Sequence, residues 1–202
     1  AGLRTVGDIA ARSPEDMREL FGGMGTKLAH LARGEDNRQV NTARHQAKSA
    51  SSSTTFGSDH ADFETLKSLL WGQCETLARR LKRADLGGRS ITLILKSSNF
   101  KVQTRSKTIP DPTQLAEVIF QAVLPKLLEA ADGTKFRLIG VRVSDMVPGD
   151  DCDPPTPFDP SAARRAQIER TMDDVRAKLG TRAISKGLNL PGRTPYSDAE
   201  LE

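Results

Sequence analysis

Hydroxyl groups recur at every second position of one short segment, at Ser49, Ser51, Ser53 and Thr55. Alternate side chains of a β-strand lie on the same face, so in a strand these hydroxyls would share one surface. Small side chains leave the backbone N–H groups accessible, and N–H and O–H groups donate hydrogen bonds to phosphate oxygens. Two interpretations are open: a flexible Ser-rich loop, or a strand that presents its hydroxyls to a phosphate backbone.

Basic side chains are unevenly distributed along the chain. The 202 residues include 30 Lys and Arg against 26 Asp and Glu, a net charge of +4. Residues 86–110 contain basic but no acidic side chains, whereas Asp145–Asp159 contains aspartates and no Lys or Arg. Because Lys and Arg bind phosphates, this segregation predicts a phosphate-binding surface, although an ordinary solvated face fits the charges equally well. The candidate residues are Arg89, Lys96, Lys101, Thr104, Arg105, Lys107, Arg137 and Arg142.

The sequence does not group residues for metal or histidine chemistry. His30, His45 and His60 occur singly, and Cys74 and Cys152 have neither metal-ligand spacing nor a disulfide framework. We therefore expect no catalytic residue, no metal site, no cofactor and a reducing, cytoplasmic environment. No apolar run approaches the roughly 18 residues of a membrane span, and the N-terminus has no signal-peptide pattern, so we expect no membrane partner.

The N-terminal part of the chain favours short helices. Residues 1–34 contain Ser13 as a helix cap and Pro14 at a first helical position. Residues 35–46 are polar and without periodicity, which indicates a linker.

The middle of the chain, residues 47–147, predicts six elements. Apolar periodicity predicts a helix over 62–84, ended by Gly87-Gly88, and a second helix that begins at Asp111-Pro112 and runs to about residue 131. Alternation predicts strands over 47–58, 91–96, 102–108 and 136–147. This βαββαβ order predicts an α+β fold in which a four-stranded sheet carries two helices on one face. The other face would then be polar and positive.

The C-terminal part, residues 148–202, is expected to follow the sheet domain as a separate segment. Residues 148–160 are rich in Pro and Asp, which favours extended chain. A helix is predicted over 160–179, with Ile168, Met172, Val175 and Leu179 on its apolar face. Residues 187–202 are expected to form a loose tail.

Several motifs, taken together and in order, resemble one known family. Residues 2–10 resemble the helix-hairpin-helix turn in the thumb of Y-family translesion DNA polymerases, and residues 48–56 resemble the first strand of their little-finger domain. Residues 104–108 and 138–144 resemble that domain's third and fourth strands. The bacterial DinB type is the most similar. Phe56 and this match favour the strand interpretation of the Ser-rich segment.

The resemblance implies a fold and a function. Residues 1–34 would be a helical thumb remnant and residues 47–147 a little finger that grips primer–template duplex through its phosphates, in an error-prone polymerase that bypasses lesions. Such contacts are independent of base sequence. Catalysis in this family uses Mg²⁺ held by palm carboxylates. Nothing in this chain matches those carboxylates, and the chain begins without Met, so we expect a part of a longer polymerase.

Two smaller sites are implied by the same resemblance. Gly2, Thr5 and Gly7 would form a thumb turn whose backbone N–H groups bind a phosphate. Bacterial members carry a sliding-clamp peptide after the little finger, and in the corresponding stretch of this chain only Phe158 matches it.

Two other functions compete with this interpretation. The chain could be a free-standing accessory protein that binds DNA or the sliding clamp without polymerase activity. A four-stranded sheet with two helices also describes the RNA recognition motif, but that module needs aromatic rings on its central strands to stack bases. Here those strands have no Tyr or Trp, and Phe100 lies in the turn and Phe136 at a strand start. We expect a monomer.

Overall fold

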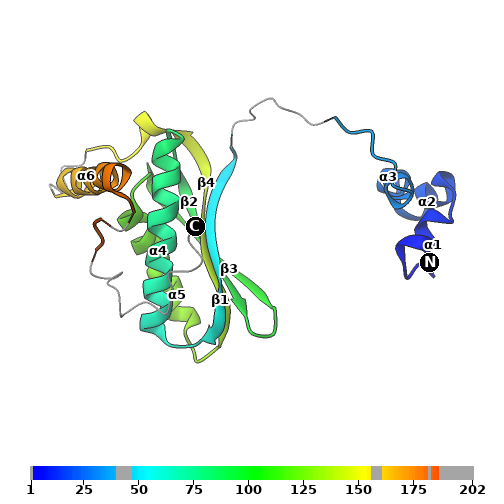
Figure 1. Cartoon of the computed structure of the whole chain (residues 1–202), viewed down its shortest axis with the longest axis horizontal. Coiled ribbons are helices and arrows are strands. Elements are labelled where there is room, and N and C mark those ends of the chain that lie inside the picture. Colours follow the sequence, from blue (N-terminus) through cyan, green and yellow to red (C-terminus); the bar gives the residue numbers. More distant parts are fainter. Residues whose placement is uncertain (1, 40–46, 156–160, 182, 187–202) are drawn as a thin grey trace. The chain divides into compact units, whose positions relative to one another are not determined.

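The computed structural model describes residues 2–39, 47–155, 161–181 and 183–186. The chain divides into two compact units, Ala1–His45 and Gln46–Glu202 (Figure 1). In the described ranges the first unit contains helices only, and the second combines a sheet with helices. No helix within these ranges is long and apolar enough to cross a bilayer.

The N-terminal unit contains α1 (Val6–Ala10), α2 (Pro14–Phe21) and α3 (Gly23–Ala32). Ser13 caps α2, and Pro14 occupies the first turn as predicted, where its missing N–H costs no hydrogen bond. The unit is held together where α2 crosses α3. Met17 is fully buried there, and a Cβ on Gly25 would overlap the Met17 carbonyl.

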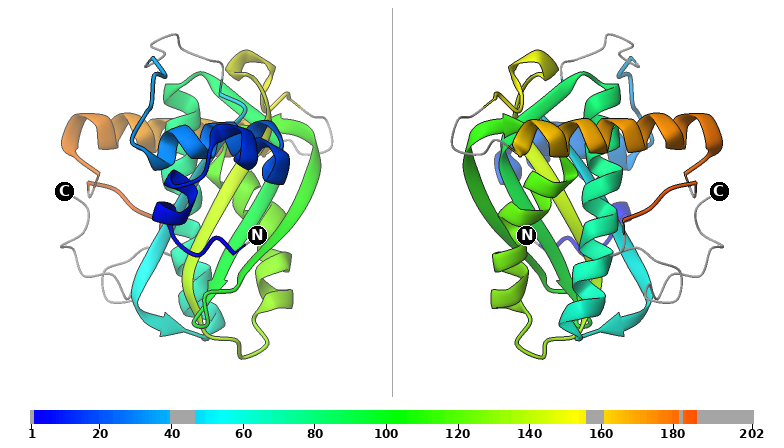
Figure 2. Two further views of the ribbon diagram at one scale, coloured as in Figure 1. Left: turned by 90° about the vertical axis from the view of Figure 1, so that its right-hand side faces the viewer. Right: turned by 90° about the vertical axis from the view of Figure 1, so that its left-hand side faces the viewer.

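A four-stranded antiparallel sheet forms the centre of the C-terminal unit, which confirms the predicted α+β class. Its strands lie in the order β1-β4-β2-β3, and α4 and α5 cover one face (Figure 2). Side chains from that face and from both helices form one apolar core, with Ile91, Ile139 and Leu127 fully buried. The elements are β1 (Ser49–His60), α4 (Phe63–Arg83), β2 (Leu86–Ser97), β3 (Val102–Thr113), α5 (Ala116–Ala130) and β4 (Phe136–Pro148).

The glycine pair Gly87-Gly88 has a different role from the one predicted. It lies inside β2, whereas α4 ends at Arg83. A Cβ on Gly87 would overlap the Cys152 sulfur, and one on Gly88 would lie 2.5 Å from the Ser144 carbonyl oxygen. The pair therefore allows β2 to pass close to its neighbours.

The start of α5 also differs from the prediction. Asp111-Pro112 belongs to the end of β3, because a residue before proline favours extended backbone, and the helix begins at Ala116. Leu115 occupies the cap position and provides no side-chain acceptor. Glu169, from a later helix, supplies it: its two carboxylate oxygens lie 2.9 and 3.1 Å from the Ala116 nitrogen.

That later helix, α6 (Ala162–Leu179), packs against α4 and the start of α5. It lies on the helix-bearing side of the sheet (Figure 2). Its predicted apolar face is only partly correct: Met172 is buried, but Ile168 and Leu179 are 46% and 75% exposed, and the other buried positions are Glu169 and Arg176. Charged side chains instead attach the helix.

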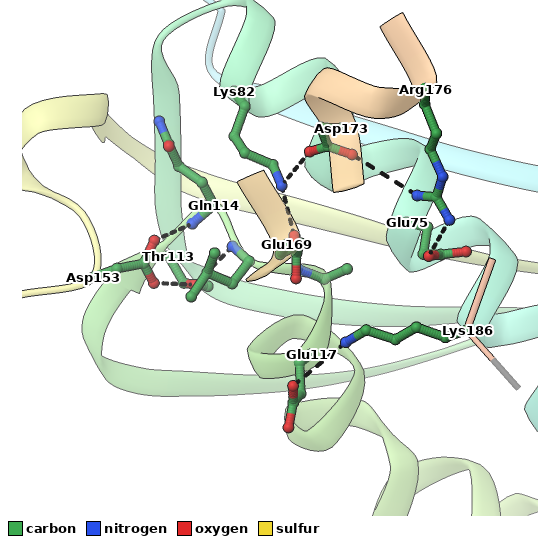
Figure 3. Close-up of polar contacts among 12 residues, drawn as sticks. Glu75, Lys82, Thr113, Gln114, Glu117, Asp153, Glu169, Asp173, Arg176 and Lys186 are labelled. Carbon is green, nitrogen blue, oxygen red and sulfur yellow. Dashed lines mark hydrogen bonds and ion pairs between the residues drawn. The ribbon is translucent and has the colours of Figure 1, made fainter. Parts of the chain in front are cut away.

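Ion pairs between largely buried side chains attach α6 to the rest of the unit (Figure 3). The Lys82 nitrogen lies 2.6 Å from a carboxylate oxygen of Glu169 and 2.6 Å from one of Asp173. Arg176 donates to Glu75 over 3.0 Å. Residues 161–179 are therefore part of the C-terminal unit.

The predicted extended segment after β4 begins instead with a 3₁₀ turn, Gly149–Asp151. Asp153 follows, and its carboxylate accepts hydrogen bonds from the Thr113 hydroxyl and the Gln114 N–H. This short segment thereby fixes the connection between β3 and α5.

Candidate nucleic-acid interface

The sheet has one face without helices, which we call the open face. Ile91, Leu93 and Leu95 point into the core, so the residues that alternate with them face the opposite way. Strand pairing then defines the rows that cross the open face. These rows are Ser49, Ser144, Ser90 and Thr108; Ser51, Arg142, Thr92 and Ser106; Ser53, Gly140, Ile94 and Thr104; and Thr55, Leu138, Lys96 and Val102.

The Ser-rich segment is a strand, as one of the two sequence interpretations predicted. In β1 the burial alternates: Ser52 is buried and donates to Gln73 over 2.7 Å, whereas Ser51 and Ser53 are exposed. Ser49, Ser51, Ser53 and Thr55 therefore share the open face.

Hydroxyl groups dominate the open face beyond β1 as well. Ser144, Ser90, Thr92, Ser106 and Thr108 come from the other three strands, and Thr92 and Ser106 hydrogen-bond across β2 and β3 over 2.9 Å. None of these five residues was predicted to belong to the site, because only the strand pairing brings them onto one face and the sequence does not show that pairing.

Gly140 lies in a middle row of the open face and adds no side chain to it. A Cβ on Gly140 would lie only 2.5 Å from the Ser53 Cβ, so no larger residue fits between β1 and β4. Most side chains in the first three rows are therefore short, and the four rows contain no Asp or Glu.

The cationic side chains of the open face lie in two places. Arg142 is exposed in a middle row, between Ser51 and Thr92. Lys96 and Arg137 meet at the β2–β3 hairpin, around Phe100: the Lys96 nitrogen lies 4.7 Å and the Arg137 guanidinium carbon 4.1 Å from the centre of the ring.

Arg137 reaches this place because β4 holds one extra residue there. Leu138 pairs with Lys96 and Phe136 pairs with Ser97, so Arg137 has no partner of its own in β2. Such a bulge re-aims a side chain that strict alternation would direct into the core.

Other predicted residues lie elsewhere. Arg105 and Lys107 pair with Leu93 and Ile91, so alternation directs them to the helix side of the edge strand. Lys107 there lines a shallow pocket with Glu117 of α5. The structure therefore separates them from Thr104, which lies on the open face. Their role in binding stays a prediction.

The remaining two cations are exposed at the margins of the sheet. Arg89 lies where the pairing of β2 with β3 loses register, and Lys101 lies in the hairpin turn, where its carbonyl accepts from the Ser97 N–H over 3.0 Å.

The N-terminal turn uses its N–H groups internally. The Asp8 carboxylate accepts from the N–H groups of Arg4 and Thr5 over 2.8 and 2.9 Å, and the Thr5 hydroxyl accepts from the Asp8 N–H. These hydrogen bonds lower the pKa of Asp8. A phosphate at the turn predicted from Gly2, Thr5 and Gly7 would thus meet a carboxylate, and that site remains a prediction. Phe158 lies outside the described residues.

No group of three or more His, Cys, Asp or Glu that could hold a metal ion occurs within the described ranges. The open face offers hydroxyl and cationic hydrogen-bond donors, which suit binding of an anionic partner.

Comparison with known proteins identifies relatives of this chain. The family described as impB/mucB/samB family C-terminal domain matches residues 47–153. DNA polymerase IV 1 of Mesorhizobium japonicum is 40% identical over 202 residues, which are 100% of this chain and 46% of that protein. DNA polymerase IV of Brucella melitensis is 40% identical over 186 residues, 92% of this chain and 42% of that protein. The chain thus spans less than half the length of these curated relatives.

Solved structures give weaker similarities. An insertion ternary complex of Dbh DNA polymerase aligns with a TM-score of 0.42 and 16% identity, over 72% of this chain and 42% of that one. A complex of the β-clamp processivity factor and the little finger domain of PolIV aligns with a TM-score of 0.43 and 20% identity, over 50% of this chain and 90% of that one.

Proposed function

Because this chain belongs to the impB/mucB/samB family, whose C-terminal domain spans residues 47–153, we propose that its open face binds the phosphate backbone of duplex DNA. The family match and the relatives named DNA polymerase IV confirm the resemblance to the C-terminal part of DinB-type Y-family polymerases.

One observation carries the proposal: the four paired rows of the open face combine hydroxyls from all four strands with the cations Arg142 and Lys96 and contain no Asp or Glu. Hydroxyls and backbone N–H groups donate hydrogen bonds to phosphate oxygens, and cations release the counterions that phosphates attract. The low centre at Gly140 lets the rows contact a backbone together. Contacts to phosphates carry no sequence information, so binding through them is independent of base sequence.

We further propose that the chain is the DNA-gripping portion of an error-prone translesion polymerase in the cytoplasm, bound to primer–template duplex. Relatives named DNA polymerase IV favour this proposal over a free-standing accessory protein. The catalytic carboxylates and their Mg²⁺ would belong to a palm domain, and no catalytic step is assigned to these residues. The sliding clamp is a second proposed partner, on the sequence match at Phe158 alone.

RNA recognition is less well supported by the same surface. The central strands β4 and β2 present Leu138, Arg142, Thr92 and Ile94 to the open face. None of these has an aromatic ring, and single-stranded RNA is recognised by stacking on such rings.

The proposal is tested by fluorescence anisotropy of the full chain with a labelled primer–template duplex at several salt concentrations. Each phosphate contact contributes about −0.9 to the log–log salt slope, so Arg142, Lys96 and Arg137 together predict a slope of about −3. Arg142→Ala should flatten it by about 0.9. Lys126→Ala, which removes an equal charge from α5, is the matched control and should leave it unchanged. Absence of duplex binding at low salt, or tighter binding of single-stranded RNA, would refute the proposal.

A further inference from the structure

An exposed aromatic side chain stands at the hairpin end of the open face. Phe100 is 61% exposed, although a ring of this size is usually buried. Lys96 and Arg137 both contact it, at 4.7 and 4.1 Å from the ring centre. Two like charges gathered around one ring repel each other, and the negative ring face offsets that repulsion.

The backbone of Phe100 is strained, which the hairpin itself does not require of a phenylalanine. Its φ is 65°, in the left-handed region that favours glycine or asparagine. The turn is closed by main-chain hydrogen bonds, from the Phe100 N–H to the Ser97 carbonyl over 2.9 Å and from the Ser97 N–H to the Lys101 carbonyl over 3.0 Å. Any residue other than proline can make these main-chain hydrogen bonds, so the turn does not explain why an aromatic residue occupies position 100.

In the part of the chain that the structure describes, neither Lys96 nor Arg137 forms an ion pair with a carboxylate. Arg137 is brought to the ring by the extra residue in β4, a feature that re-aims side chains near functional sites. The bulge at Arg137, the strained backbone of Phe100 and the exposed ring of Phe100 therefore all lie at the same two cations, which form no ion pair with a carboxylate among the described residues.

We propose that Lys96, Arg137 and Phe100 form a phosphodiester-binding site at the hairpin end of the open face, in which the Phe100 ring is the positioning residue for both cations. The ring holds two flexible side chains where they meet a nucleic-acid backbone, so less conformational freedom is lost on binding. This inference rests on the proposed function and adds to it a residue that carries no charge.

The test is a set of variants of the full chain, measured by anisotropy with the same duplex. Phe100→Leu keeps an apolar side chain but removes the π face, and we expect duplex affinity to fall about three- to tenfold, since two exposed cation–π contacts are lost. Phe100→Tyr keeps the ring and should bind like the wild type. Leu128→Ala, which truncates a comparably exposed apolar residue (63%) on α5, is the matched control.

Two further readouts separate positioning from a purely structural role. Phe100→Gly relieves the backbone strain, so its resistance to urea should match or exceed that of the wild type while its affinity falls as in Phe100→Leu. In a Lys96→Ala, Arg137→Ala background, Phe100→Leu should cause less than about a twofold further loss, because residues that act together are not additive.

The outcomes distinguish the two proposals. If the wild type binds duplex and Phe100→Leu binds within twofold of it, or if the Phe100→Leu loss persists in full without the two cations, this inference is overturned and the proposed function stands. If the wild type binds no duplex at low salt, the proposed function itself fails.

Discussion

Replacing Glu169 by alanine should destabilise the C-terminal unit more than any change to its surface charges. The Glu169 side chain comes from α6, is almost fully buried, and accepts from the Ala116 N–H at the start of α5 over 2.9 and 3.1 Å. It also pairs with Lys82 over 2.6 Å. One substitution therefore removes a helix cap and half of a buried ion pair.

The magnitude follows from these two losses. Loss of an N-terminal cap costs about 1 kcal/mol. Breaking a buried ion pair costs about 3–5 kcal/mol when the remaining charge is left alone. Lys82 keeps Asp173 at 2.6 Å, so the second loss is smaller here. We expect Glu169→Ala to lower the free energy of unfolding by about 2–4 kcal/mol, and Glu169→Gln, which keeps one acceptor oxygen, by about 1–2 kcal/mol.

The assay is urea unfolding followed by the fluorescence of Trp71. It is the only tryptophan in the sequence and belongs to α4, where its ring packs edge-on against Phe120 at 5.1 Å. The signal therefore reports on the C-terminal unit alone. Glu129→Ala, which breaks an exposed ion pair on α5, is the control and should change stability by less than about 0.5 kcal/mol. A Glu169→Ala effect no larger than this control would refute the capping role.

Three further predictions concern the sheet, the pH dependence of stability and the thiol of Cys152. Gly140→Ala should lower stability by about 1–3 kcal/mol in the same assay, because its Cβ would meet the Ser53 Cβ at 2.5 Å; no change would show that β1 shifts freely. The Thr65 N–H donates to Asp62 and lowers the pKa of Asp62, so the stability from this ionised cap is present above about pH 4 and lost as the pH falls through that lowered pKa. Asp62→Ser keeps a helix cap that does not titrate. Urea unfolding measured at several pH values between about 5 and 2 should show the free energy of unfolding of the wild type falling faster than that of this variant. Burial, and next the neighbouring Asp153, raise the pKa of the Cys152 thiol to about 11, so iodoacetamide should alkylate it slowly at about pH 8 in the native protein and readily in urea; rapid native alkylation would contradict this.

The alternation within β1 could be predicted from the sequence because it depends on one strand only. Ser49, Ser51 and Ser53 share a face in any strand that contains them. The faces of β3 could not be predicted in the same way. This edge strand is polar on both sides, so no apolar stripe distinguishes Thr104 from Arg105, and only the pairing of Lys96 with Val102 across the hairpin decides which one lies on the open face.

The attachment of α6 was missed for a different physical reason. Apolar periodicity predicted a face that runs from Ile168 to Leu179, of which Met172 is buried. The helix also buries Glu169 and Arg176, whose charges are compensated by partners far away in the sequence. Hydrophobic periodicity assigns charged residues to the solvent-exposed face of a helix, so it does not predict that Glu169 and Arg176 are buried. Arg137 was predicted to bind, but its meeting with Phe100 depends on a bulge that the sequence does not reveal.

Methyl NMR of the full chain during titration with a primer–template duplex would locate the DNA-binding surface directly. The Ile94, Leu138 and Val102 methyl groups lie on the open face, whereas Leu128 and Ile168 are exposed on α5 and α6. If the open face binds DNA, the largest shift changes appear at Ile94, Leu138 and Val102, and Leu128 and Ile168 stay unchanged. Changes concentrated at Leu128 and Ile168, with the open-face methyls unaffected, would show that DNA binds the helix-bearing side and not the open face.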